Sequence, residues 1–268
     1  MVWISLQVCT LASGSSGNAI YIGTEDKKIL VDAGLSGKEI NNRLKKINLG
    51  VQDLDLILIT HEHSDHIKGA GVLARRCNIP LYATAGTWQV SEDKLGKVAR
   101  DCKSVIDTTG FSVGSCDIKP FTISHDAKEP VGYTITSRGE KVAVATDMGE
   151  ITSEVMAEIK DSNLVILESN HDLEMLKIGP YPWSLKKRVM SAKGHLSNDD
   201  AGAGVVELVK NSVNRILLAH LSKDNNVPEL AFLTIKNMLV DAGFNLDDIH
   251  LDFAHQDSVG QLYQVNKL

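Results

Sequence analysis

Three histidines and one aspartate lie within six consecutive positions, at His61, His63, Asp65 and His66. Histidine is rare in this chain, with nine in 268 residues, so a cluster of this density is hard to attribute to chance. Imidazole and carboxylate ligands without thiolate suit zinc, manganese or iron, rather than a closed structural zinc site. The cluster therefore predicts a metal site.

The flanking sequence indicates how these side chains are positioned. Residues 54–60 form an apolar run of strand length without helical period, and residues 67–77 predict the helix that follows. Side chains at positions i and i+2 of an extended backbone point the same way, so His61 and His63 are placed to share one ion. Asp65 and His66 then fall near the start of the helix and face a second position.

Three other polar residues each close an apolar run of strand length. His125 follows residues 121–124, Asp147 follows 142–146 and His220 follows 216–219. Active-site loops of layered α/β folds converge at such strand ends. Taken singly, each residue is explained as well by a capped strand end or a hydrogen-bonded core histidine. Taken with the cluster, they predict the remaining ligands of a two-metal site.

Length and composition limit the class of protein. A chain of 268 residues with 43% hydrophobic content can bury a large core, and we expect one domain over residues 1–268. The formal net charge of −6 argues against indiscriminate coating of nucleic acid, but a local basic groove and bound metals still permit a nuclease. The sequence shows neither a membrane span nor a signal peptide, so we expect a cytoplasmic protein without a membrane partner.

The pattern of elements predicts a layered fold. Strand patterns fall at 3–11, 19–22, 28–32, 54–60, 80–83, 121–124, 131–136, 141–146, 164–168, 215–219 and 260–265, and helical patterns at 37–47, 67–77, 87–94, 153–160, 185–191, 198–210 and 228–242. The first part is rich in strands, whereas the second alternates strand and helix. Mixed sheets packed face to face, with helices outside, fit this order.

Asp32, within residues 29–34, precedes the other motifs and completes a series of five, followed by the 61–66 cluster, His125, Asp147 and His220. Together they resemble the metallo-β-lactamase fold superfamily. The resemblance implies an α/β (α+β) fold, a four-layer αββα sandwich, with two divalent metal ions (zinc, manganese or iron) at its edge.

The same resemblance implies a ligand assignment. His61, His63 and His125 would hold the first ion, Asp65, His66 and His220 the second, and Asp147 would bridge them. Asp32 would steady the histidine loop from behind the ligands, unless it is a plain turn aspartate.

Within the superfamily, the ligand set is similar to the phosphodiesterase branch that includes tRNase Z. No cysteine lies near Asp147, where lactam-hydrolysing members commonly have one. Glu168, in 167–171, resembles the acidic strand end of tRNase Z, and His195, in 194–197, resembles its extra histidine. His195 would donate a proton to the leaving oxygen, while Asp65 orients a hydroxide shared by the metals; a structural role beside a helix cap is the alternative for His195.

Four segments, 11–18, 168–172, 179–183 and 194–198, resemble the YycJ/WalJ family of bacterial metallo-hydrolases. This resemblance runs end to end and implies a 5′ to 3′ exonuclease acting on double-stranded DNA. Two alternatives stay open: hydrolysis of a small molecule such as a thioester, lactone or cyclic nucleotide, and a non-catalytic role as a metal-stabilised regulator. The sequence leaves the oligomeric state open.

Candidate substrate contacts come from three segments: Ser15, Ser16 and Asn18; Asn170 and His171; Trp183 and Lys186. The small residues of 13–18 suit a phosphate cradle or, equally well, a tight hairpin. Trp183, near Tyr181 and the cations at 186–188, suits stacking on a terminal base, with aromatic packing beside a solvated helix face as the alternative. We interpret His250 and His255 as structural.

Overall fold

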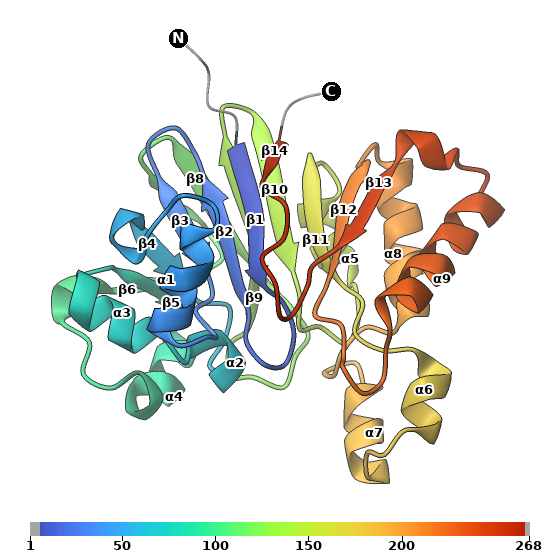
Figure 1. Cartoon of the computed structure of the whole chain (residues 1–268), viewed down its shortest axis with the longest axis horizontal. Coiled ribbons are helices and arrows are strands. Elements are labelled where there is room, and N and C mark those ends of the chain that lie inside the picture. Colours follow the sequence, from blue (N-terminus) through green and yellow to red (C-terminus); the bar gives the residue numbers. More distant parts are fainter. Residues whose placement is uncertain (1–5, 266–268) are drawn as a thin grey trace.

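Two mixed β-sheets of seven strands each lie face to face, with helices on their outer sides (Figure 1). The structure is a computed structural model that describes residues 6–265. This arrangement confirms the predicted α/β (α+β) sandwich with αββα layers.

The first sheet has the strand order β14-β1-β2-β3-β4-β5-β6. Its strands are β1 (Leu6–Ala12), β2 (Ala19–Gly23), β3 (Lys28–Val31), β4 (Leu56–Leu58), β5 (Leu81–Thr84), β6 (Lys103–Ile106) and β14 (Tyr263–Val265). Strands β3 to β6 pair in parallel, so their carboxyl ends lie along one edge of the sheet.

The second sheet has the order β13-β12-β11-β10-β9-β8-β7. Its strands are β7 (Phe111–Val113), β8 (Cys116–Thr122), β9 (Val131–Ser137), β10 (Glu140–Ala145), β11 (Leu164–Glu168), β12 (Arg215–Ala219) and β13 (His250–Phe253). Strands β10 to β13 pair in parallel, and their carboxyl ends also share an edge.

Helices cover the outer face of each sheet. The first sheet packs against α1 (Gly37–Lys45), α3 (Ala70–Cys77) and α4 (Ala85–Leu95), and the second against α5 (Ser153–Ile159), α8 (Asn198–Lys210) and α9 (Pro228–Asp241). Three short 3-10 helices span Val51–Asp53, Arg100–Cys102 and Leu246–Asp248, and α2 spans Ser64–Ile67. The pair α6 (Leu173–Ile178) and α7 (Trp183–Val189) projects from one end of the sandwich (Figure 1).

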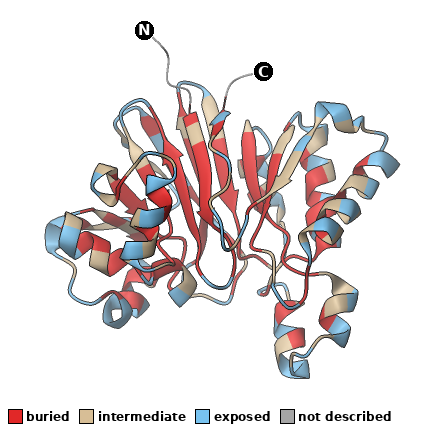
Figure 2. Ribbon diagram, in the orientation of Figure 1, coloured by how far each residue is buried: buried red, intermediate tan, exposed pale blue. Residues whose placement is uncertain are grey.

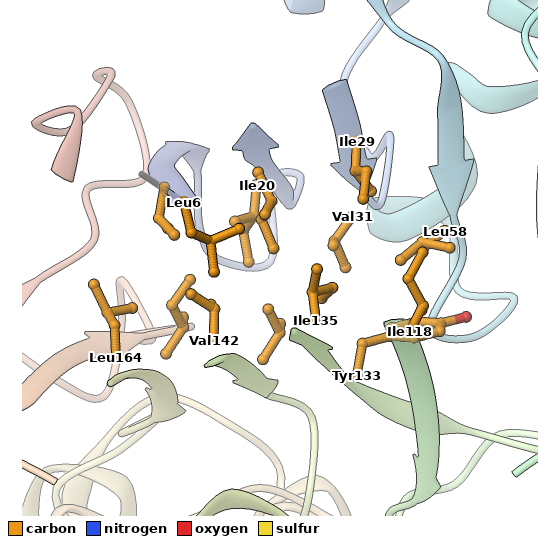
Figure 3. Close-up of a cluster of buried hydrophobic side chains, with 14 of the residues drawn as sticks. Leu6, Ile20, Ile29, Val31, Leu58, Ile118, Tyr133, Ile135, Val142 and Leu164 are labelled. Atoms are coloured by element: carbon orange, nitrogen blue, oxygen red, sulfur yellow. The ribbon is translucent and has the colours of Figure 1, made fainter. Parts of the chain in front are cut away.

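The facing surfaces of the two sheets form the central core. Ile20 and Val31 of the first sheet face Tyr133, Ile135 and Val142 of the second (Figure 3), and all five are buried (Figure 2). Full burial of a side chain of this size contributes about 1.5–3 kcal/mol. This apolar centre fixes the two sheets against each other, and hence the strand ends that carry the polar residues.

The structure corrects several predicted boundaries. The predicted helix 67–77 is two helices, α2 and α3, divided at Gly69, whose amide donates to the Ala33 carbonyl at 2.7 Å. A Cβ at Gly69 would lie 2.3 Å from the Leu35 carbonyl oxygen, so the chain must turn there with glycine. Strands β6, β7 and β13, helix α6 and the first half of β8 were missed because these segments lack long apolar runs. The start of the predicted strand 3–11 lies outside the described residues.

No helix between residues 6 and 265 combines the length and apolar character needed to cross a membrane. All four cysteines are free thiols. Cys9, Cys102 and Cys116 are buried, and Cys77 is half-buried.

Gly34 gives a direct test of how the site loops pack. Its amide donates to the Asn18 carbonyl at 2.8 Å, the Asn18 amide donates to the Asp65 carbonyl at 2.8 Å, and a Cβ at Gly34 would lie 1.6 Å from that Asp65 oxygen. We expect Gly34→Ala to destabilise the protein by about 3 kcal/mol or more, the upper end of overpacking effects, because backbone atoms block the methyl group.

Urea unfolding of Gly34→Ala measures this loss. Gly37→Ala is the matched control, since its new methyl would meet only side chains, Leu73 at 3.2 Å and Val72 at 3.7 Å. An unchanged urea midpoint for Gly34→Ala would show that the loops carrying Asn18, Gly34 and Asp65 are not packed in this way.

Candidate metal centre

The polar residues identified in the sequence gather where parallel strands end. Asp32 directly follows β3, Asp147 follows β10 by two positions, His220 directly follows β12, and Glu168 is the last residue of β11. The 61–66 cluster follows β4 and runs into α2, at the lower edge of the sandwich in Figure 1. The topology therefore brings residues that are distant in sequence to one edge.

Three of these residues have a left-handed backbone. Asp32, Asp147 and His220 have φ angles of 62°, 59° and 57°, and only seven non-glycine residues between 6 and 265 have positive φ. Such conformations cost about 1–3 kcal/mol each and persist where the surrounding structure enforces them. Each residue ends its strand abruptly, and its side chain turns toward the shared edge. The concentration of strain here points to a functional centre.

His61, His63 and His125 form a first group of possible metal ligands. His61 Nε2 lies 3.0 Å from His63 Nδ1, and His125 Nε2 lies 3.3 Å from the same atom. His125 Nδ1 lies 3.1 Å from the Gly194 carbonyl oxygen, to which it donates, so Nε2 keeps a lone pair toward the group. Burial lowers the pKa of His61 well below its ordinary value and lowers the pKa of His125, which keeps both rings neutral as metal ligands must be.

Asp65, His66 and His220 form a second group, and Asp147 lies between the two. Asp147 Oδ2 is 3.4 Å from His66 Nε2, and its Oδ1 is 3.4 Å from His220 Nδ1. Asp147 also belongs to a group with His61 and His66. A carboxylate in this position can contact ions held by either group.

Two buried polar atoms in the centre have no hydrogen-bond partner among the described residues: Asp147 Oδ2 and His220 Nε2. An unsatisfied buried polar atom costs about 1–3 kcal/mol, so it calls for a partner. A divalent cation coordinated by imidazole nitrogen and carboxylate oxygen would satisfy both atoms. The residues present therefore fit divalent metal ions.

The pKa values of His66 and His220 also indicate a site for cations. Burial alone would lower the pKa of His66, but Asp147 and Asp32 raise it well above its ordinary value. Burial alone would also lower the pKa of His220, which Asp147, Asp65 and Glu168 raise to about 10. The buried carboxylates therefore favour positive charge beside them. Without a bound cation, protonated His66 and His220 supply that charge.

Asp32 holds His66 in place. Its Oδ2 lies 2.7 Å from His66 Nδ1, and it also accepts hydrogen bonds from the Thr60 hydroxyl at 2.8 Å and the Thr60 amide at 2.9 Å. Thr60 was not predicted, although a polar residue closing the apolar run 54–59 was a usable signal. These contacts aim His66 Nε2 at the centre.

We expect Asp32→Ala to weaken metal binding by about 10–100-fold, the usual effect of removing the residue that orients a histidine ligand. Competition titration with a metal chelator measures the affinity. Asp161→Ala, at an exposed carboxylate on the surface, is the control. Wild-type affinity in Asp32→Ala would show that the centre does not depend on this orientation.

The buried Glu168 pairs with the partly exposed His195 beside the ligands. Glu168 Oε1 lies 2.8 Å from His195 Nδ1 and 2.8 Å from His220 Nδ1, and Oε2 accepts from the Met148 amide at 2.8 Å. Burial alone would raise the pKa of Glu168, but His195 and His220 lower it to about 2. The acidic partner of His195, which the sequence left unassigned, is therefore Glu168. The contact uses Nδ1 and leaves Nε2 for a substrate.

The candidate substrate contacts separate into two sets. Ser15 and Asn170 line a cavity of about 170 Å³, together with His195 and His220. Ser16 is exposed on the same β1–β2 loop as Ser15, so residues 13–18 form a hairpin that reaches the site.

The other candidate substrate contacts do not line this cavity. Asn18 is buried against His66, with its Nδ2 3.0 Å from His66 Nε2. His171 is 1% exposed, and burial lowers its pKa to about 4. Trp183 is 58% exposed, outside the cavity. Lys186 is buried, and its ammonium donates to the carbonyls of Lys177 and Gly179, which joins α6 to α7.

Eight further residues line the cavity, and they belong to α7 and to the loops around it: Asp126, Tyr181, Leu185, Arg188, Val189, Gly194, Ser222 and Asn225. The sequence pattern around 181–188 pointed to this region through its aromatic and basic residues. His250 and His255 contact the rings of Tyr263 and Phe253, consistent with their structural interpretation.

Comparison with known proteins defines the family. A family model described as a β-lactamase superfamily domain matches residues 27–220, and the chain belongs to the metallo-β-lactamase superfamily. It is 44% identical over 248 residues to exodeoxyribonuclease YycJ of Bacillus anthracis, covering 91% of this chain and 93% of that protein. It is 43% identical over 260 residues to exodeoxyribonuclease WalJ of Streptococcus pneumoniae strain D39, covering 95% of each. These matches confirm the predicted resemblance.

Solved structures share the fold at low sequence identity. The metallo-β-lactamase fold protein YhfI from Bacillus subtilis superposes with a TM-score of 0.72 at 19% identity, covering 96% of this chain and 99% of YhfI. The short form of human tRNase Z superposes with a TM-score of 0.64 at 16% identity, covering 97% and 100%. Both comparisons support the sandwich architecture.

Proposed function

We propose that this protein is a metal-dependent phosphodiesterase that removes nucleotides from double-stranded DNA in the 5′ to 3′ direction. The observation that carries this proposal is the Glu168–His195 pair beside two groups of metal ligands that share Asp147. The pair supplies a positioned proton donor, and the ligands supply a site for charge neutralisation. The names of the relatives, both exodeoxyribonucleases, support DNA as the substrate.

His61, His63 and His125 would hold the first of two divalent ions, and Asp65, His66 and His220 the second, with Asp147 within reach of both ligand groups. When bound, two divalent ions supply a nucleophilic hydroxide near neutral pH and neutralise charge on the phosphoryl oxygens. Zinc, manganese and iron all suit these ligands.

The chain's own residues then complete the reaction. Asp65, whose side chain is 23% exposed, accepts a hydrogen bond from the attacking water and orients it toward phosphorus. His195 donates its Nε2 proton to the leaving oxygen as the phosphorus–oxygen bond breaks, and Glu168 fixes the ring through Nδ1. The side chains of Asp65 and His195 reach solvent, whereas those of Asp147 and Glu168 are 3% and 0% exposed. A substrate therefore meets Asp65 and His195 first.

The alternatives are less well supported. The complete ligand set argues against a non-catalytic regulator, and the exodeoxyribonuclease relatives argue against a small-molecule hydrolase. We further propose one domain over the whole chain, since β14 pairs with β1, and a cytoplasmic location, where free cysteines stay reduced.

Digestion of plasmid DNA tests the proposal. With manganese or zinc, we expect the protein to degrade linear duplex DNA and to leave covalently closed circles intact, while His63→Ala degrades neither. Nicking of the circles would contradict an exonuclease, and intact linear DNA with metal bound would contradict a DNA phosphodiesterase.

A further inference from the structure

The cavity of about 170 Å³ lies between α7 and the loops that carry the site. It is smaller than the roughly 300–1,000 Å³ of pockets that hold drug-sized ligands, so it has room for at most one nucleoside. His195 and His220 line one side of it. Its contents therefore lie next to the residue that we assign to protonation of the leaving oxygen.

Leu185 and Val189 of helix α7, together with Tyr181 just before it, form a further wall of the cavity, which we call the α7 wall. Two contacts hold this wall in place. The Tyr181 hydroxyl donates to Asp224 at 3.0 Å, and the buried Lys186 ammonium ties α7 to the end of α6. A strand that enters from the metal centre meets a fixed wall.

The lining offers both apolar and polar contacts. Leu185 and Val189 provide apolar surface for a base or sugar, while Asn170, Ser222 and Asn225 provide amide and hydroxyl groups. Asn225 is 1% exposed, and its Oδ1 has no hydrogen-bond partner among residues 6–265. Arg188 pairs with Asp126 beside His125 and places a cation at the rim, where phosphate would pass.

We propose that this cavity receives the 5′-terminal nucleoside of the strand, on the leaving-group side of the scissile phosphate, and that the α7 wall limits each cut to one nucleotide. This inference rests on the proposed function. In the cut, a bond forms between the oxygen of the attacking hydroxide and phosphorus, and the bond between phosphorus and O3′ of the terminal nucleotide breaks. O3′ takes the proton from His195, and the phosphate stays on the next nucleotide.

The same geometry sets the direction of digestion. If the strand entered from its 3′ end, the group leaving through O3′ would be the whole remaining strand, which is far too large for a cavity of about 170 Å³. Entry from the 5′ end leaves one nucleoside there. The wall thus explains both single-nucleotide steps and 5′ to 3′ polarity.

Two substitutions of opposite size at Leu185 test the wall. On duplex DNA labelled with 5′-³²P, we expect the wild-type protein to release the label as a mononucleotide. Leu185→Ala should open the wall and release labelled dinucleotides and longer products. Leu185→Trp should fill the cavity and slow release at least 10-fold with unchanged metal content. Leu173→Ala, at a half-buried leucine of α6 outside the cavity, is the matched control.

Calorimetric titration with thymidine 5′-monophosphate supplies an independent measure. We expect binding to wild type and to Leu173→Ala, and at least a 10-fold loss of affinity in Leu185→Trp. If DNA is cut but both Leu185 variants release only mononucleotides at the wild-type rate, the wall has no such role, whereas the proposed function stands. If wild type cuts no DNA, the proposed function fails, and equal nucleotide binding by all variants would overturn the cavity's role as well.

Discussion

His195→Ala should lower the rate of DNA hydrolysis by about 10²-fold or more while metal content stays unchanged, the usual scale for loss of a general acid. His195 contacts Glu168 at 2.8 Å and forms one possible ligand group with Asp147, Glu168 and His220, but the other three groups do not include it and persist without it. Single-turnover cleavage of labelled duplex DNA measures the rate, and elemental analysis measures the metal.

His250→Ala is the matched control, since that exposed histidine contacts only the ring of Tyr263 among aromatic neighbours between residues 6 and 265. A DNA substrate with a better leaving group adds a second readout, because it needs less protonation and should recover part of the lost rate. Full activity of His195→Ala, or loss of metal together with activity, would contradict a role in proton transfer.

Asp147→Ala should abolish metal binding and activity together. The loss should exceed the ~10–100-fold effect of removing a residue that only orients a ligand, because Asp147 contacts both groups. Stability should also fall when metal is present, since a ligand at 1,000 times its dissociation constant stabilises a protein by about 4 kcal/mol.

Elemental analysis, cleavage assays and thermal unfolding with and without a chelator test this expectation. The chelator should lower the melting temperature of wild type and leave that of Asp147→Ala unchanged. Asp161→Ala, at an exposed carboxylate, should behave like wild type throughout. A variant that retained both metals and full activity would exclude Asp147 from the centre.

The candidate metal ligands were predictable because each follows an apolar run, and because strands that run in parallel end at the same edge. The 61–66 cluster, His125, Asp147 and His220 could be identified in this way, and the structure brings them into overlapping groups. Short, half-exposed elements such as β6 escaped prediction, since edge strands carry little apolar pattern.

Contacts between distant residues could not be predicted from local patterns. The pairing of Glu168 with His195 and the contact of Asn18 with His66 depend on how loops meet in three dimensions. The buried position of Lys186 is of the same kind, since the next two residues are exposed cations and its carbonyl partners lie at the end of a different helix, α6. Backbone strain at strand ends likewise becomes visible only in the structure.

End-labelled duplex DNA provides the most direct test of metal-dependent removal of nucleotides from 5′ ends. Substrates labelled at either the 5′ or the 3′ end would be incubated with manganese or zinc and with wild type or His63→Ala. We expect immediate release of the 5′ label as a mononucleotide, late release of the 3′ label, and neither with His63→Ala. Equal cleavage by His63→Ala, or intact DNA in the presence of metal-loaded wild type, would contradict this function.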